Sequence, residues 1–313
     1  MVRLATSILL LILLSFSSIS VSSQAPATKL TNNPTLTVTD AGSWKVIQKG
    51  VEFRKMVLER SEPSHSIDLK LLRFDTRLVI PRVLRSTQFQ LKSANAKTFA
   101  EKSGALATIN GSYFETEGKP LAFLKIASQA INARIAKNSL YTGVFGIKAQ
   151  QPLISQRDDF LAEQVDEGLQ SGPLLLLHGT LQTVTGIPSR ASRRALIGID
   201  PDQRLVIAVA DSLLGGLHWP ELQEIFSAAP WQIQVTDLLN LDGGGSTSIA
   251  MEDPLTHTGA LVNVSSDNPA GRSVASNLAI FAIPVPEPSS SALAATALFL
   301  VLGRYLMRRH NKV

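Results

Sequence analysis

The strongest chemical signature in the chain is an acidic residue followed by three glycines, in the run LNLDGGGST at residues 239–247. An apolar segment leads to Asp242, and Gly243–Gly245 then allow positive φ and a close approach of the backbone to a ligand. Successive N–H groups in such a turn can form a nest for an anionic oxygen, and Ser246 adds a hydroxyl beside it. Asp242 could serve there as a nucleophile, a general base or a metal ligand. The competing interpretation is a flexible hairpin turn with a capping aspartate.

Two further motifs carry polar groups next to apolar runs that read as strands. In NGSYF, Asn110 could bind sugar hydroxyls or orient a phosphate, and Tyr113 could stack on a pyranose ring. The alternative interpretation of this motif is an Asx-type turn followed by two aromatic residues of the core. Ser171 and Gly172 precede the Leu174–Leu177 run and predict a tight turn with a free hydroxyl.

Arginines supply a candidate anion clamp. Arg194 precedes an apolar run and Arg272 lies in GRSV, and guanidinium groups bind phosphate in a bidentate manner. We therefore expect both arginines to converge on the glycine turn. The alternative is a solvated charge cluster, which we expect for Arg193 because neighbours on an extended chain point to opposite sides.

Short strands and two helices are predicted to position these residues. Asn95 suits the N-cap of a helix that ends at Ser103 with Gly104 as its C′ residue, and Pro220–Ala228 has proline at a helix start. Alternation and apolar runs predict strands at 46–47, 51–53, 67–74, 78–83, 106–109, 174–177, 196–199, 205–210, 248–251 and 278–283. The fold class expected is α+β, a single domain over residues 44–283 with a mixed, strand-dominated sheet and a few packed helices. Residues 24–43, rich in Thr, Asn, Pro and Ser, are expected to form a linker.

Composition excludes several classes of function. The chain has no cysteine, so disulfides, thiolate metal sites and cysteine nucleophiles are ruled out. Of the net charge of +5, only about +1 falls on residues 24–283, which argues against a nucleic-acid partner. The sequence also lacks a G-x-S-x-G elbow, a P-loop and an H-E-x-x-H motif.

Both ends of the chain read as export signals. Residues 1–23 combine Arg3, an apolar run and small residues, as in a secretory signal peptide, with an uncleaved anchor as the alternative. Residues 284–313 resemble a PEP-CTERM sorting tail: VPEP, an apolar stretch, then Arg308 and Arg309. That resemblance implies export machinery and an exosortase-type protease as partners, and transient membrane contact through 289–307; a plain membrane anchor is the alternative. Either way the expected location is outside the cytoplasm: periplasm, outer surface or extracellular matrix.

Taken in order, the motifs of residues 44–284 resemble the phosphodiester glycosidase family. The resemblance rests on seven blocks: ATINGSYF, LQSGPLLL, RRALIGID, RLVIAVADS, GLHWPELQEIF, LNLDGGGSTSIAM and GRSVASNLAIF. The residues on the family's motif positions are Asn110, Ser171, Gly172, Arg194, Asp242, Gly243, Gly244, Gly245 and Arg272. Ser112 and Ser212 depart from it, since many members have glycine at both places.

The resemblance implies an exported hydrolase that cleaves the glycosidic bond of a sugar-1-phosphodiester in envelope or extracellular polysaccharide. Asp242 would face the anomeric carbon, and Arg194, Arg272 and the glycine N–H groups would stabilise the departing phosphate. Glu115 and Asp211 are reserve carboxylates. No cofactor is expected, although a divalent-metal phosphodiesterase is one alternative and a non-catalytic surface module that binds glycan or sugar phosphate in exopolysaccharide is another. Retention or inversion depends on a carboxylate separation that the sequence does not contain.

Overall fold

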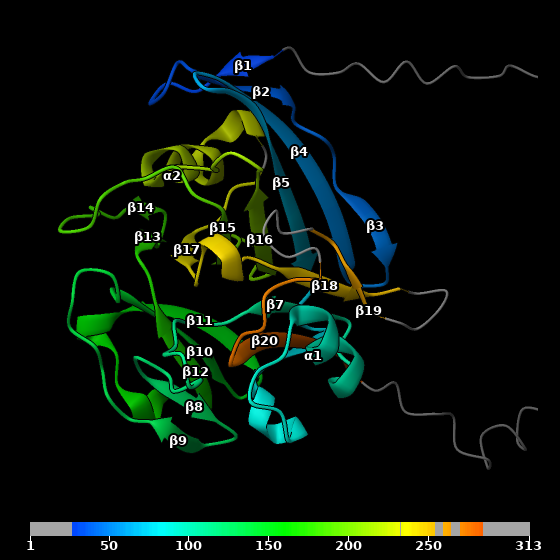
Figure 1. Ribbon diagram of the computed structural model, residues 1–313, viewed down its shortest axis with the longest axis vertical. Helices are drawn as coiled ribbons and strands as arrows, with labels where there is room; N and C mark the ends of the chain where they lie inside the picture. The colour runs from blue at the N-terminus through cyan, green and yellow to red at the C-terminus, as the bar shows by residue number, and fades with distance from the viewer. Residues whose placement is uncertain (1–26, 232, 254–258, 264–269, 284–313) are drawn as a thin grey trace, which may run out of the picture.

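Antiparallel strands dominate the part of the chain that the computed structural model describes, residues 27–231, 233–253, 259–263 and 270–283 (Figure 1). Within those residues the fold is α+β with β structure predominating, as expected. The prediction of a mixed sheet is wrong, because every strand pair in the described residues is antiparallel. Hairpins such as β4–β5 and β15–β16 join sequence neighbours directly, whereas parallel pairing would need long crossover connections.

The largest sheet has ten strands, in the order β1-β2-β4-β5-β16-β15-β17-β13-β14, with β3 paired to β4. Its strands are β1 (Thr28–Lys29), β2 (Leu36–Asp40), β3 (Lys45–Gln48), β4 (Val51–Ser61), β5 (Ser64–Phe74), β13 (Leu174–Leu177), β14 (Thr180–Leu181), β15 (Arg194–Ile199), β16 (Leu205–Asp211) and β17 (Asp237–Asn240).

Two five-stranded sheets complete the β structure of the described residues. One has the order β11-β10-β12-β8-β9, formed by β8 (Leu124–Ile126), β9 (Gln129–Asn132), β10 (Gly143–Lys148), β11 (Gln151–Gln156) and β12 (Glu167–Ser171). The other has the order β19-β18-β7-β20-β6, formed by β6 (Val79–Arg85), β7 (Ala107–Asn110), β18 (Ile249–Glu252), β19 (Gly259–Leu261) and β20 (Ser276–Ala282).

The large sheet is buried on both faces, which explains its almost continuously apolar central strands. Leu72 and Ile207 face a core shared with the two smaller sheets, where Phe145 and Ile280 also lie. Leu71, next to Leu72, instead faces a second core that includes residues of helix α2. Successive side chains of a strand point to opposite faces, so a strand covered on both sides needs apolar residues at each position.

Two α-helices lie in the described residues, and their sequence signals are confirmed. Helix α1 (Ala96–Ser103) begins after Asn95, whose side chain accepts from the Thr98 N–H, and ends at Gly104 with φ of 70°. Helix α2 (Trp219–Ser227) starts one residue before the predicted proline. It covers the large sheet, whereas α1 covers the β18-β7-β20 sheet, as Figure 1 shows. Five short 3-10 turns are also described: Ser86–Phe89, Arg157–Asp159, Ala162–Gln164, Ala229–Trp231 and Gly244–Ser246.

Part of the predicted linker 24–43 belongs to the fold, which corrects that prediction. Strand β2 pairs with β4, and the side chains of Leu30, Leu36 and Val38 are buried in the core under α2. The polar residues between them hide this pattern, because only alternate residues of β2 face the core.

The predicted signal peptide (1–23) and sorting tail (284–313) lie outside the described residues. Within the described ranges, no helix combines the length and the apolar character needed to cross a membrane.

Candidate active site

The backbone of Asp242 is fixed between two sheets, directly after β17. Its N–H donates to the Gly111 carbonyl (3.1 Å), and its carbonyl accepts from Asn110 Nδ2 (2.6 Å). The other end of the Asn110 amide accepts from the Ser248 N–H at 3.0 Å. Because both ends of this fully buried amide are used inside the protein, Asn110 positions Asp242. The sequence predicted Asn110 at the site but as a group that binds the ligand.

The carboxyl group of Asp242 is half-buried and accepts hydrogen bonds from the Ser246 side chain and the Gly243 N–H. Burial raises its pKa to about 6, against the lowering effects of these two donors and of the positive charge of Arg272. A carboxyl with a pKa near 6 changes its ionisation close to neutral pH, which is the behaviour required of a general base or nucleophile.

Two N–H groups of the predicted anion nest donate to oxygen atoms of the protein. The Gly243 N–H donates to the Asp242 carboxylate, and the Gly244 N–H donates to the Arg193 carbonyl at 3.0 Å. A Cβ on Gly243 would lie 2.9 Å from that same carbonyl oxygen, and Gly244 has φ of 58°. The glycines are needed for close packing and left-handed backbone. At most the Gly245 N–H remains for a ligand.

Arg194 begins β15 and is held on three sides. Its Nε donates to the Leu217 carbonyl at 3.0 Å, one Nη donates to the Arg190 carbonyl, and its guanidinium carbon lies 3.4 Å from the centroid of the Trp219 ring. Burial lowers its pKa to about 10, so Arg194 remains a cation at neutral pH. Its charge interacts with Tyr113 of the site, and its remaining nitrogen makes no hydrogen bond to the described residues.

Tyr113 and Asn240 form a small polar network beside Asp242. The Tyr113 hydroxyl lies 3.1 Å from the Gly172 carbonyl and 3.3 Å from the Leu241 carbonyl, and Asn240 Nδ2 lies 3.2 Å from the Tyr113 oxygen. Burial and the charge of Asp242 raise the pKa of Tyr113. Since the hydroxyl is engaged by protein groups, the structure gives Tyr113 a role in shaping the site. Stacking of its ring on a sugar stays a prediction.

The other predicted site residues lie at the edges of this network. Arg272 is exposed and acts on Asp242 through its charge. Ser171 is fully buried at the end of β12, with no partner for its hydroxyl in the described residues. Gly172 fits against the Leu140 carbonyl, where a Cβ would be only 1.9 Å from the oxygen.

The reserve carboxylates stand apart from Asp242. Glu115 is exposed, and Asp211 is half-buried with a pKa raised by burial, near Lys70 and Arg193. Arg193, which precedes β15, is half-buried, so its prediction as part of a solvated charge cluster is not confirmed. Arg194 stacks on Trp219. Among the described residues no group of three His, Asp or Glu side chains is arranged to hold a metal ion.

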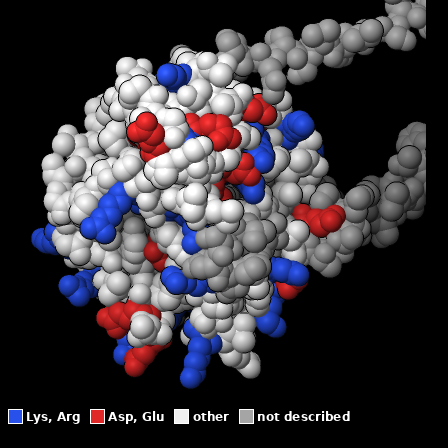
Figure 2. All heavy atoms as spheres, turned by 45° about the horizontal axis from the view of Figure 1, so that its top comes forward, with Lys and Arg blue, Asp and Glu red and all other residues white. Residues whose placement is uncertain are grey.

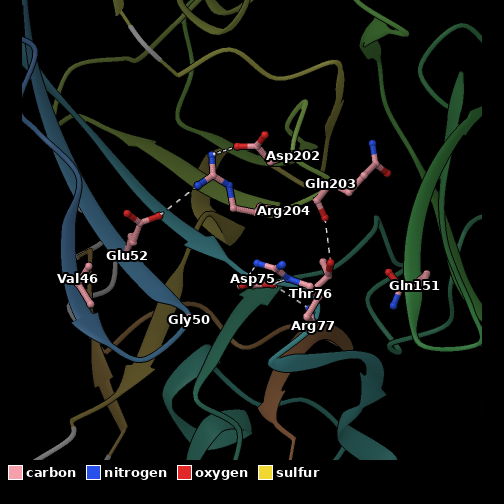
Figure 3. A pocket seen from close by; sticks show the side chains of 10 residues that line it. All are labelled: Val46, Gly50, Glu52, Asp75, Thr76, Arg77, Gln151, Asp202, Gln203 and Arg204. Atoms are coloured by element: carbon pink, nitrogen blue, oxygen red, sulfur yellow. Dashed lines mark hydrogen bonds and ion pairs between the residues drawn. The ribbon is translucent and has the colours of Figure 1, made fainter.

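A cavity of about 620 Å³ lies at the opposite end of β15, next to the turn that contains Asp202 and Arg204 (Figure 3). Its charges are paired with one another: Arg204 with Asp202 (2.8 Å), and Arg77 with Asp75 (2.7 Å). Basic and acidic side chains are likewise interspersed on the face in Figure 2, with no single-sign patch. Because this cavity lies at the end of β15 away from Arg194, it is not part of the Asp242 site.

Sequence reasoning missed three residues of the site. Asn240 interrupts an apolar strand, and a polar residue at a buried strand position is a usable signal. Trp219 stands one residue before the predicted helix start and has no predicted role, although it stacks on Arg194. Tyr141 lies in no motif, and only the folded chain brings its ring to 5.5 Å from that of Tyr113.

The chain matches the model of a family whose name describes a class of hydrolases. The matched family is described as phosphodiester glycosidase, and the match spans residues 103–281, more than half of the 313 residues. The chain belongs to the phosphodiester glycosidase family. No curated protein sequence matches it.

Two solved structures show the same fold. A hypothetical protein from Synechocystis aligns with a TM-score of 0.57 and 14% identity, over 79% of this chain and 65% of that chain. The zebrafish N-acetylglucosamine-1-phosphodiester alpha-N-acetylglucosaminidase catalytic domain, auto-inhibited by its pro-peptide, aligns with a TM-score of 0.56 and 17% identity, over 82% and 86% of the two chains. This chain thus spans just under two thirds of the first structure. At these identities the likeness shows the fold.

Proposed function

We propose that this chain is an exported hydrolase that cleaves the glycosidic bond of a sugar-1-phosphodiester in envelope or extracellular polysaccharide. The observation that supports the proposal best is the Asp242 carboxyl, whose pKa of about 6 arises in a half-buried position between donors on one loop. Membership of the family and the fold shared with the zebrafish glycosidase agree with it.

Asp242 and the two arginines have different roles in the proposed reaction. Ionised Asp242 acts on the anomeric carbon, as nucleophile or as base for a water molecule. The bond from that carbon to the phosphate oxygen breaks, its electron pair leaves with the phosphate, and water supplies the oxygen that replaces it. Arg194 and Arg272 stabilise the charge on the departing phosphomonoester. Because a phosphomonoester is a good leaving group, a strong general acid is less necessary than in ordinary glycosidases.

The cellular setting belongs to the proposal as well. The signal-like residues 1–23 and the PEP-CTERM-like residues 284–313 support export, processing by an exosortase-type protease, and transient membrane contact. The same features support polysaccharide outside the cytoplasm as the substrate.

The test compares the full chain with Asp242→Asn on a panel of sugar-1-phosphodiesters that includes a nucleotide sugar. Free sugar and an intact phosphomonoester are quantified separately. We expect both products from the wild type and a loss of at least a thousandfold in the variant, because the amide cannot act as nucleophile or base. Asp158→Asn, an exposed aspartate paired with Arg157, is the matched control and should retain activity.

Three results would contradict the proposal in different ways. Turnover that survives in Asp242→Asn would remove Asp242 from the reaction. Activity that disappears on exhaustive chelation would favour the metal-dependent phosphodiesterase. Saturable binding of sugar phosphates, equal in wild type and variant and without turnover, would favour the non-catalytic glycan-binding module.

A further inference from the structure

Tyr141 is held rigidly beside the Asp242 site by contacts to its own backbone. Its carbonyl accepts from Gln170 Nε2 at 2.9 Å, and the buried Gln170 side chain also bonds both backbone groups of Ala136. The preceding Leu140 carbonyl fits against Gly172. The ring of Tyr141 meets that of Tyr113 edge to face, with 5.5 Å between centroids and 89° between planes. The position of this side chain is therefore fixed before any ligand binds.

The hydroxyl of Tyr141 differs from that of Tyr113 in having no hydrogen-bond partner among the described residues. The side chain is only 5% exposed, yet its oxygen makes no hydrogen bond to the described residues and is not among the buried atoms that lack a partner. The small exposed area thus includes the hydroxyl. In contrast, the Tyr113 hydroxyl is engaged by Gly172, Leu241 and Asn240.

The ring of Tyr141 packs against Tyr113, whose hydroxyl bonds the carbonyl of Leu241, the residue before Asp242. Burial raises the pKa of Tyr141, the negative charge of Asp242 raises it further, and the charge of Arg134 opposes that change. At neutral pH the hydroxyl consequently keeps its proton and is a donor. A neutral donor beside the residues that hold Asp242 suits an anionic acceptor that lies next to the anomeric carbon.

We propose that Tyr141 is a substrate-binding residue whose hydroxyl donates a hydrogen bond to a phosphate oxygen of the sugar-1-phosphodiester. This assignment rests on the proposed function, since it places the phosphate between Asp242 and Tyr141. A hydrogen bond to a charged group contributes about 1.5–3 kcal/mol, which corresponds to roughly a 10- to 100-fold change in affinity.

The experiment uses Tyr141→Phe in the full chain, because phenylalanine keeps the ring contact with Tyr113 and removes only the hydroxyl. Two readouts are taken: kcat/KM on the sugar-1-phosphodiester panel, and the Kd of a sugar-1-phosphate measured by calorimetry. We expect each to worsen at least tenfold while the melting temperature stays within about 1 °C of the wild type. Tyr141→Leu, which removes the ring as well, should lower the melting temperature and so reports the structural contribution.

The two readouts separate this inference from the proposed function. If the wild type hydrolyses the panel and Tyr141→Phe changes kcat/KM and Kd less than twofold, the role of Tyr141 is refuted and the hydrolase stands. If the wild type shows no turnover, the hydrolase is refuted, and the Kd alone decides: a tenfold weaker Kd in Tyr141→Phe supports the contact. An equal Kd, or no sugar-1-phosphate binding by the wild type, overturns it.

Discussion

At the scale of single residues, the donors around Asp242 act in opposition to its burial. Burial favours the neutral carboxylic acid, whereas Ser246, the Gly243 N–H and Arg272 favour the carboxylate. The pKa of Asp242 is thus the balance between burial, which raises it, and these three groups, which lower it. Removing one donor should therefore change the pH at which the site becomes active.

We predict that kcat/KM on a sugar-1-phosphodiester falls on the acid side of pH 6, by about tenfold per pH unit below that value, because protonated Asp242 cannot act as nucleophile or base. In Ser246→Ala the carboxylate loses a donor, so its pKa should rise and the acid limb should move to higher pH. The measurement is the pH–rate profile of both proteins.

The matched control for that profile is Ser139→Ala, an exposed serine outside the loop, whose acid limb should coincide with that of the wild type. An acid limb that is unchanged in Ser246→Ala would show that the titrating group is not Asp242.

At the scale of secondary-structure elements, helix α2 presents Trp219 to Arg194 and is fixed by a buried ion pair. Arg60 of β4 donates to both carboxylate oxygens of Glu221 at 3.0 and 2.9 Å, and both side chains are almost fully buried. Asn33 Nδ2 adds a third contact to Glu221 at 2.6 Å. The orientation of Arg194, which stacks on Trp219, thus depends on the contact between α2 and β4.

We predict that Glu221→Gln lowers the free energy of unfolding by about 3–5 kcal/mol, since it leaves the Arg60 cation buried without its anion. It should also lower kcat/KM, because Trp219 is the first residue of the same helix. Urea denaturation measures the stability. Glu224→Gln, at a half-buried glutamate of the same helix that accepts from the Thr31 and Asn32 N–H groups, is the control and should cost less than Glu221→Gln, because it leaves no cation buried without its anion. Equal effects of the two variants would contradict the role of the buried pair.

Elements with strong local signals could be predicted from the sequence, and elements defined by distant contacts could not. The caps of α1 and the run of four leucines in β13 gave correct boundaries. Strand β12 reads EGLQS, without apolar alternation, yet it is fully buried. Glu167 pairs with Arg82 and Gln170 bonds the loop before β10, so its burial depends on partners far away in sequence.

The candidate site divides in the same way. Asp242, its glycines, Arg194 and Asn110 stood out as residue types next to predicted strands, and the structure gathers them. The direction of each side chain could not be predicted, since the Asn110 amide and the Gly244 N–H could have faced a ligand as well as the protein. Tyr141 enters the site only through the packing of its loop against Gly172.

At the scale of the whole molecule, the residues before Trp44 are part of the fold. We predict that a chain beginning at Trp44 fails to fold, whereas one beginning at Ala27 folds. Burial of each of Leu30, Leu36 and Val38 contributes about 1.5–3 kcal/mol, and together these approach the whole stability of an average domain. Circular dichroism and soluble yield of the two truncated chains measure the difference. A cooperative melt of the shorter chain close to that of the longer one would contradict the prediction.

The position of β20 has a consequence for when the protein folds. This last described strand lies inside its sheet, between β7 and β6, and it pairs Ala282 with Val79 across most of the chain. Such non-local pairing makes folding slow, because long loops must close before their contacts form. Strand β6 has no other sheet partner in the described residues, and Asn277 of β20 lies opposite Asn110 of the site. During synthesis, the sheet that contains β6 and β7 therefore cannot be completed until residue 282 has emerged, and the strand beside Asn110 of the candidate site is among the last described segments to be made.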